Sequence, residues 1–180
     1  AGSIGSEISR QLASYGLQNL ILVDQAESAL YDLQQELHQR NCTNVVTIVA
    51  DIRDHDRMES LFKTYRPEKV FHAAAYKHVP LMEQSPYEAV RINILGTKIV
   101  ADLAVAYQVE RFVMISTDKA VTPTNVMGAT KRVAEMYISC LSKQQTSTKF
   151  TTTRFGNVLG SNGSVIPLFK RQIENGGPLT

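Results

Sequence analysis

Short apolar runs alternate with longer helical patterns along most of this chain, and this alternation restricts the fold more than any other feature. Five runs have the length and the β-branched or aromatic content of strands, namely residues 20–24, 45–50, 69–72, 111–116 and 149–155. Strands that alternate with helices are typical of βαβ units, which build a parallel sheet. The sequence therefore predicts an α/β fold with a doubly wound parallel sheet.

Six segments carry apolar residues at the spacing of amphipathic helices. We expect helices over residues 6–15, 27–40, 56–65, 87–107, 126–141 and 165–174. No apolar run approaches the ~18 residues that a membrane helix needs, so no membrane contact is expected from this segment.

The composition indicates one domain and excludes some partners. The chain has 180 residues and a net charge of +2, and its basic residues are mixed with acidic ones, so we expect no nucleic-acid binding. The four histidines and two cysteines show no metal-ligand spacing, and no metal is expected. Cys42 and Cys140 are expected as reduced thiols of a cytoplasmic protein.

The first residues are similar to the end of a glycine-rich dinucleotide loop. Gly2, Ser3, Ile4 and Gly5 lead directly into the first helical segment. In such loops the backbone amides and the helix dipole hold a pyrophosphate. Two glycines three positions apart also fit an ordinary turn, and both interpretations stay open for the loop alone.

Acidic residues close the first two strands and favour the dinucleotide interpretation. Asp24 ends the strand at 20–24, where a carboxylate can bind both ribose hydroxyls of NAD and repel a 2′-phosphate. Asp51 and Ile52 close the next strand, where an adenine would lie. For both aspartates the alternative role is a helix cap. Together with the loop they predict a Rossmann-type site for NAD.

A polar cluster follows the fourth strand. Thr117, Asp118 and Lys119 lie at its carboxyl end, and ligands bind at that edge in open α/β sheets. Met127 and Lys131 follow on the next helix, four residues apart and therefore on one face. The alternatives are a surface turn with a weak ion pair for Asp118 and Lys119, and a solvated helix lysine for Lys131.

Longer motifs add a family resemblance that covers nearly the whole chain. The runs at 2–7, 73–83 and 93–97 resemble the extended short-chain dehydrogenase/reductase superfamily. The runs at 116–131 and 154–165 are similar to nucleotide-sugar 4,6-dehydratases of the capsular-polysaccharide type, which act on UDP-N-acetylglucosamine.

The resemblance implies a reaction with a recycled NAD cofactor. Hydride leaves sugar carbon 4, the resulting ketone acidifies the proton on carbon 5, and water is lost across carbons 5 and 6. Hydride then returns to carbon 6. The expected product is a UDP-linked 4-keto-6-deoxy sugar for bacterial surface polysaccharide or glycan synthesis.

The resemblance also assigns roles to the polar cluster. Asp118 would protonate the leaving hydroxyl, which requires burial to raise its pKa. Lys119 would take the proton from carbon 5, and burial and Lys131 would lower its pKa. Thr117 would bond the oxygen on carbon 4, and Lys131 would hold the nicotinamide ribose.

Met127 departs from the superfamily pattern, which has a tyrosine four residues before the lysine. A thioether cannot accept a proton, so Met127 is expected only as a space-filling contact with the substrate. The base for oxidation at carbon 4 therefore stays open between Asp118 and a water held by Thr117.

Further binding positions follow from the resemblance. Ala73 and Ala74 would lie beside the cofactor. The sugar nucleotide would contact Lys77, His78, Asn157, Ser164 and Val165. For Lys77 and His78 a packing or solvent-exposed role is equally open, and Arg154 is a candidate partner of the diphosphate.

The organisation expected for the chain is that of an internal segment. Residues 1–180 would be one NAD-binding domain that lacks its first strand and a substrate-covering lobe, because no strand precedes Gly2. The absent strand would lie between residues 20–24 and 69–72, and without it the piece would be inactive and would aggregate or pair its open edges. The parent protein is expected to be homo-oligomeric and cytoplasmic, with a possible inner-membrane anchor.

Two rival functions remain open. A nucleotide-sugar epimerase or reductase would use NAD and Lys131 without needing Asp118 and Lys119, and would normally have a tyrosine at position 127. A non-catalytic dinucleotide-binding sensor would explain the loss of the tyrosine. It would not explain why Asp118, Lys119 and Lys131 are all present.

Overall fold

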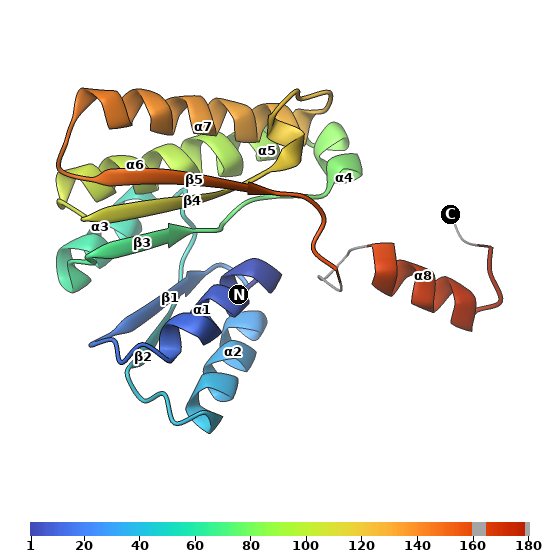
Figure 1. The fold of residues 1–180 in the computed structure, drawn as a ribbon, viewed down its shortest axis with the longest axis horizontal. Coiled ribbons are helices and arrows are strands. Elements are labelled where there is room, and N and C mark those ends of the chain that lie inside the picture. Colours follow the sequence, from blue (N-terminus) through green and yellow to red (C-terminus); the bar gives the residue numbers. More distant parts are fainter. Residues whose placement is uncertain (160–164, 179–180) are drawn as a thin grey trace.

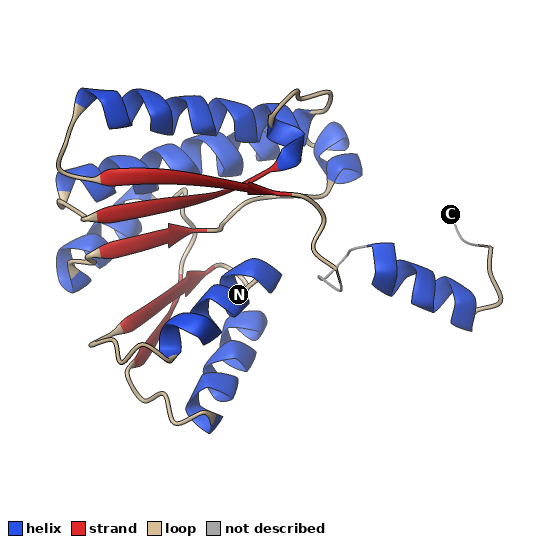
Figure 2. Ribbon diagram, viewed as in Figure 1, coloured by secondary structure: helices blue, strands red, loops and turns tan. Residues whose placement is uncertain are grey.

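The computed structural model describes residues 1–159 and 165–178, and it has the predicted α/β arrangement (Figures 1 and 2). Its strands are β1 (Leu20–Asp24), β2 (Val45–Val49), β3 (Lys69–His72), β4 (Arg111–Thr117) and β5 (Lys149–Phe155). All pairs of neighbouring strands are parallel. The predicted strand positions and their direction are therefore confirmed.

Helices connect the strands in the predicted order. They are α1 (Ser3–Ala13), α2 (Glu27–Gln39), α3 (His55–Tyr65), α4 (Val79–Gln84), α5 (Pro86–Ala89), η1 (Val90–Gly96), α6 (Thr97–Ala106), η2 (Asp118–Ala120), α7 (Val126–Gln144) and α8 (Val165–Glu174). The single helix predicted at 87–107 is thus α5 and α6 joined by the π-helix η1. Among the described residues, no helix combines the length and hydropathy needed to cross a bilayer.

Two hydrophobic clusters support the two sides of the molecule. Leu30, Leu33 and Leu37 of α2 pack under β1 and β2. Phe112 and Met114 of β4 belong to a larger cluster with residues of α3, α6 and α7. Burial alternates along β4, because successive strand residues point to opposite faces. Figure 2 shows α6 and α7 on one face of the sheet formed by β3, β4 and β5.

The strands form two separate hydrogen-bonded groups. The order is β1–β2 in one and β3–β4–β5 in the other, and β1 and β3 are not paired with each other among the described residues. A cavity of about 1220 Å³ is lined by residues of both strands, including Ile21, Val23, Val70 and Phe71. Figure 1 shows β1 and β3 facing each other across this region.

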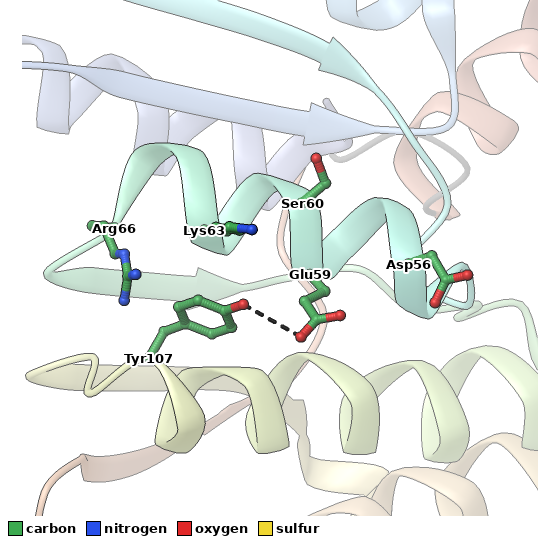
Figure 3. A pocket seen from close by; sticks show the side chains of 6 residues that line it. All are labelled: Asp56, Glu59, Ser60, Lys63, Arg66 and Tyr107. Carbon is green, nitrogen blue, oxygen red and sulfur yellow. Dashed lines mark hydrogen bonds between the residues drawn. The ribbon is translucent and has the colours of Figure 1, made fainter.

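A second, smaller cavity of about 390 Å³ lies beside α3 (Figure 3). Its lining residues are Asp56, Glu59, Ser60, Lys63, Arg66 and Tyr107. The Tyr107 hydroxyl donates to Glu59 at 3.3 Å, and the Arg66 guanidinium lies 4.9 Å from the centre of the Tyr107 ring. None of the predicted site residues lines this cavity, and both signs of charge are mixed in it.

Candidate active site

The large cavity brings most of the predicted site residues together. Those lining it are Gly2, Ser3, Ile4, Gly5, Asp24, Ile52, Ala73, Ala74, Lys77, His78, Thr117, Lys119, Met127, Lys131 and Asn157. Asp51 and Asp118 are not among the lining residues, although their sequence neighbours are. Ser164 and the side chain of Val165 lie outside the described part of the structure.

The glycine loop leads straight into a helix N-terminus. Gly2 is the N-cap of α1 and, lacking a side chain, makes no side-chain capping bond. The first-turn amides of an uncapped helix are donors for an anion. The helix begins at Ser3, earlier than predicted, so Ile4 and Gly5 belong to its first turn.

Asp24 lies at the carboxyl end of β1 and does not cap a helix. Its Oδ1 accepts from the backbone nitrogen of Ala26 at 2.9 Å, and Ala26 is the N-cap of α2. Its Oδ2 accepts from the amino group of Ala1. The helix-cap alternative is therefore wrong for Asp24, whose carboxylate lines the cavity.

Asp51 is held by an arginine that the sequence analysis missed. Its carboxylate accepts from the Arg53 side chain at 2.6 and 2.9 Å, and Arg53 also donates to Glu88 at 2.8 Å. The bonds from Arg53 hold the pKa of Asp51 below its ordinary value, against the effect of burial. Asp54, not Asp51, caps α3, so the cap alternative for Asp51 is also wrong.

The residues of the polar cluster lie together after β4, in the form of the alternative given for Asp118 and Lys119, an exposed turn with a weak ion pair. The Thr117 hydroxyl donates to Oδ1 of Asp118 at 2.9 Å, and the Lys119 ammonium lies 3.4 Å from the same oxygen. The Lys119 ammonium also donates to Oδ1 of Asn157 at 3.3 Å. Asn157 follows β5, so the ends of two neighbouring strands meet at this cluster.

The electrostatics of Asp118 differ from the prediction. Its side chain is 55% exposed, and the Thr117 hydroxyl, assisted by the charge of Lys119, holds the pKa of the carboxyl below its ordinary value. The sequence predicts a buried carboxyl with a raised pKa, which is wrong for this structure. The Lys119 side chain is 36% exposed, so its predicted burial is also wrong.

Lys131 is buried, unlike the other two ionisable groups. Its side chain and that of Met127 lie on one face of α7, and both residues are only 4% exposed. The Lys131 ammonium donates to the Ile115 carbonyl at 2.8 Å. Burial lowers the pKa of Lys131 to about 8, while the carboxylate of Glu135 acts in the opposite direction. The alternative of a solvated helix lysine is therefore wrong.

Two glycines permit close approach in this cluster. A Cβ at Gly128 would lie 2.4 Å from the Lys119 carbonyl oxygen, so only glycine fits where α7 begins. A Cβ at Gly156 would lie 3.3 Å from Oδ2 of Asp118. The need for glycine at position 128 was not predictable from the sequence, because its contact with the Lys119 carbonyl forms only in the folded chain.

Arg154 does not face a ligand site. Its Nε and Nη2 donate to the two carboxylate oxygens of Glu135 at 2.8 and 2.6 Å. The predicted pairing of Arg154 with a diphosphate is therefore replaced by an ion pair within the protein. Glu135 lies one turn after Lys131 on α7, and the sequence analysis missed it.

A buried polar network behind the cavity was also missed. The Asn93 amide donates to the Tyr76 carbonyl at 3.1 Å and to the Thr130 hydroxyl at 3.0 Å, and its oxygen accepts from the Tyr76 nitrogen at 2.9 Å. His72 bonds the Thr97 hydroxyl at 2.8 Å, and burial, with the charge of Lys131, lowers its pKa to about 3. The sequence signal for this network is an asparagine inside the apolar run at 92–96.

The site contains no cluster typical of a metal centre. Among the described residues, no group of three or more histidine, cysteine, aspartate or glutamate side chains could hold a metal ion. Lys119 and the buried Lys131 are among the ionisable groups that line the cavity, and Asp118 adjoins it as the partner of Lys119. Such a set can exchange protons with a ligand that occupies the cavity.

Sequence comparison identifies long relatives of this chain. CapD, a capsular polysaccharide biosynthesis protein of Staphylococcus aureus, is 54% identical over 181 residues, which are 99% of this chain and 30% of CapD. A UDP-N-acetylglucosamine 4,6-dehydratase (inverting) of Campylobacter jejuni is 33% identical over 177 residues, which are 97% of this chain and 52% of that enzyme. The chain thus spans 30 to 52% of the length of these relatives.

Structure comparison confirms the doubly wound α/β fold. Pen from Bacillus thuringiensis superposes with a TM-score of 0.89 at 40% identity, over 97% of this chain and 55% of Pen. The UDP-glucose 4-epimerase of Thermus thermophilus, solved in complex with NAD, gives a TM-score of 0.80 at 25% identity, over 99% of this chain and 61% of the epimerase. A family model described as "polysaccharide biosynthesis protein" matches residues 1–180, so this chain belongs to that family.

Proposed function

We propose that the protein containing this chain is a nucleotide-sugar 4,6-dehydratase that converts UDP-N-acetylglucosamine to a UDP-linked 4-keto-6-deoxy sugar with recycled NAD. The observation that carries the proposal is the meeting of Thr117, Asp118, Lys119 and Asn157 at the ends of β4 and β5. Buried Lys131 lines the same cavity. The dehydratase relative and the CapD relative support the substrate and the place in polysaccharide synthesis.

The residues present fit a dinucleotide. The uncapped start of α1 offers backbone amides for a pyrophosphate, and Asp24 offers a carboxylate for a ribose. Lys131 offers a buried donor for the second ribose. The epimerase of similar fold was solved with NAD, which supports the same cofactor here. When bound, NAD supplies the acceptor and donor of hydride.

The residues of the chain would carry the proton transfers. Thr117 would donate a hydrogen bond to the oxygen on carbon 4, and the Asp118 carboxylate would accept the proton of that hydroxyl as hydride leaves carbon 4. Lys119, once neutral, would remove the proton from carbon 5 and later return it. Asp118 delivers a proton to the hydroxyl that leaves carbon 6. Because Asp118 is half exposed, the bound sugar must first exclude water from it, which raises the pKa of a carboxyl.

The rival functions have weaker support. An epimerase or reductase has no need of the Asp118–Lys119 pair, and Met127 cannot accept a proton as a tyrosine could. A dinucleotide-binding sensor has no need of a buried amine whose pKa is lowered to about 8. Likeness to epimerases does not separate a dehydratase from an epimerase, because the UDP-glucose 4-epimerase of Rickettsia rickettsii is 35% identical over 99% of this chain and the dehydratase relative is 33% identical.

The rest of the proposal concerns the whole protein. We place residues 1–180 within one NAD-binding domain, with a UDP-sugar as its substrate partner. The protein would act in the cytoplasm, where nucleotide sugars are made, and would assemble as a homo-oligomer. Light scattering of the full-length protein tests the assembly.

The decisive experiment uses the full-length protein with UDP-N-acetylglucosamine in deuterated water. NMR should show a 4-keto-6-deoxy product with solvent deuterium at carbon 5. Lys119→Met should abolish the product, and Lys143→Met, an exposed lysine at the end of α7, should not. An epimerised sugar as the only product, or binding of NAD without any turnover, would exclude the dehydratase.

A further inference from the structure

Glu135 is a buried carboxylate behind the site and has no role in the proposed chemistry. Its side chain is only 5% exposed, which is rare for a glutamate and requires pairing. Arg154 meets both carboxylate oxygens, at 2.8 and 2.6 Å, and Arg132 lies 3.3 Å away. Burial would raise the pKa of Glu135, but these partners hold it below its ordinary value, so Glu135 is a carboxylate.

Arg154 connects this carboxylate to the reacting groups. It lies on β5 opposite Ser116, and the next pair in register is Thr117 with Phe155. Beyond Phe155 the chain passes Gly156, where even a Cβ would come within 3.3 Å of Asp118. It then reaches Asn157, which accepts from Lys119 at 3.3 Å. A displacement of Arg154 would therefore move both contacts.

We propose that Glu135 is a positioning residue for the dehydration, because it anchors Arg154 and thereby holds the end of β5 against Asp118 and Lys119. A bidentate carboxylate–guanidinium pair fixes both distance and angle, which a single contact would not do. This inference rests on the proposed function of the site. It adds a role for a residue that touches neither substrate nor cofactor.

Glu135 has a second effect through Lys131, which lies one turn before it on α7. The groups that face Glu135 are Arg132, Arg154, Lys131 and the Ser116 hydroxyl. His72 faces Lys131 from β3 and is neutral. Because the charge of Glu135 raises the pKa of Lys131, its removal must shift the loss of the Lys131 proton to lower pH.

The first test uses Glu135→Gln in the full-length protein. Glutamine keeps the volume and one acceptor for Arg154 but removes the charge. Turnover of UDP-N-acetylglucosamine should fall roughly tenfold to 100-fold, as expected for displaced reacting groups. The affinity for NAD at neutral pH should change by less than about threefold, because no contact to NAD is lost. NAD affinity should decline at a lower pH than in the unmodified protein, because Lys131, the proposed donor to the second ribose, loses its proton at a lower pH.

A readout without turnover separates this inference from the proposed function. Hydrogen exchange of the backbone at residues 155–159 should be faster in Glu135→Gln than in the unmodified protein, with or without NAD. Exchange in β1 should be unchanged. If the protein is no dehydratase but exchange still rises at 155–159, the anchoring role stands and only the function is wrong.

Two further variants keep the test decisive. Glu135→Gln with Arg154→Gln removes both charges of the ion pair, so neither is left without its partner and the protein should fold. The double variant should show the same loss of turnover and the same faster exchange as Glu135→Gln. Glu36→Gln breaks another bidentate pair, which joins α2 to Arg10 of α1 at 2.8 and 2.9 Å, and should change neither turnover nor exchange at residues 155–159. Normal turnover and normal exchange in the double variant would overturn the proposal.

Discussion

The two strand groups of this molecule are stabilised in different ways. Around β1 and β2 the core is apolar, built on Leu30, Leu33 and Leu37, and the Arg10–Glu36 ion pair lies at the surface. Around β3, β4 and β5 the interior also contains polar and charged groups, including Asn93, Lys131 and Glu135. The first side offers amides and one carboxylate to a ligand, whereas the second combines the exposed Asp118–Lys119 pair with a network of buried polar contacts.

This contrast teaches where substitutions should matter. A buried polar group is costly to leave without its partner, so changes around β3–β5 should affect both stability and reaction. Changes around β1–β2 should affect mainly cofactor affinity. Five substitutions test the contrast, and they follow in order of expected effect.

Lys119→Met should have the largest effect. It removes the proposed base at the end of β4, and turnover should fall by roughly 10³-fold, within the range of general-base catalysis. NAD should stay bound, because Lys119 contacts Asp118 and Asn157 and not the start of α1. Steady-state kinetics and cofactor titration of the full-length protein measure the two quantities. Turnover within tenfold of normal would contradict the assigned role.

Asn93→Ala should reduce stability by about 3 kcal/mol, because it leaves both backbone groups of Tyr76 without their partner. The control on the other side is Asn44→Ala, which removes the bond to the Leu17 carbonyl and the weak bond that the Cys42 thiol donates to the Asn44 oxygen. It should cost about 1 kcal/mol. Denaturant unfolding of both variants measures the difference. Equal losses would remove the distinction between the two sides.

Lys131 links stability to pH. Its pKa is lowered to about 8 in the folded protein from an unfolded value of 10.5, so the folded state binds fewer protons between these values. Burial of the charged amine therefore costs stability below pH 8, and this cost disappears as the pH rises to 10.5. Lys131→Met should be more stable than the unmodified protein at neutral pH, by roughly 2 to 3 kcal/mol. Unfolding at several pH values should show this advantage shrinking above pH 8.

Asp24→Ala tests the β1–β2 side. The variant should bind NAD about tenfold more weakly, since a charge-assisted hydrogen bond contributes about 1.5 kcal/mol or more. The preference for NAD over NADP should decline, because the carboxylate that would repel a 2′-phosphate is gone. Calorimetric titration with both cofactors measures the ratio. Tighter binding of NADP by the unmodified protein would contradict the role of Asp24.

The elements were predictable because their signals are local. Each strand is a short apolar run, and the Ser-Thr-Asp-Lys cluster follows directly from the end of β4. The π-helix η1 was not predictable, because Asn93 is satisfied there by Tyr76 and Thr130, which are distant in sequence. The exposure of Asp118 was not predictable either, because it depends on the fold around that residue. The pKa of the exposed carboxyl is lowered, whereas the sequence predicted a raised pKa.

The sequence predicted most of the residues that line the cavity, but not the residues that hold them in place. The cavity is lined by most of the positions that the family motifs mark as candidates for cofactor or substrate binding. Arg53 holding Asp51 and Glu135 holding Arg154 are contacts between a residue of the motif and one outside it. Nothing in the spacing of Glu135 distinguishes it from an exposed helix glutamate, so only the folded chain assigns its partner.

Met127→Tyr should have the smallest effect, although position 127 is buried and lies on the β3–β5 side. Met127 packs on Met82 and Ala89 but also lines the large cavity, so a longer ring can extend into open space. Stability should therefore change by less than about 1.5 kcal/mol, as in tolerated core exchanges. Met127→Ala, which leaves a void against Met82, should cost about 2 kcal/mol or more. If the tyrosine variant instead proves less stable than the alanine variant in urea unfolding, the cavity does not extend over α7.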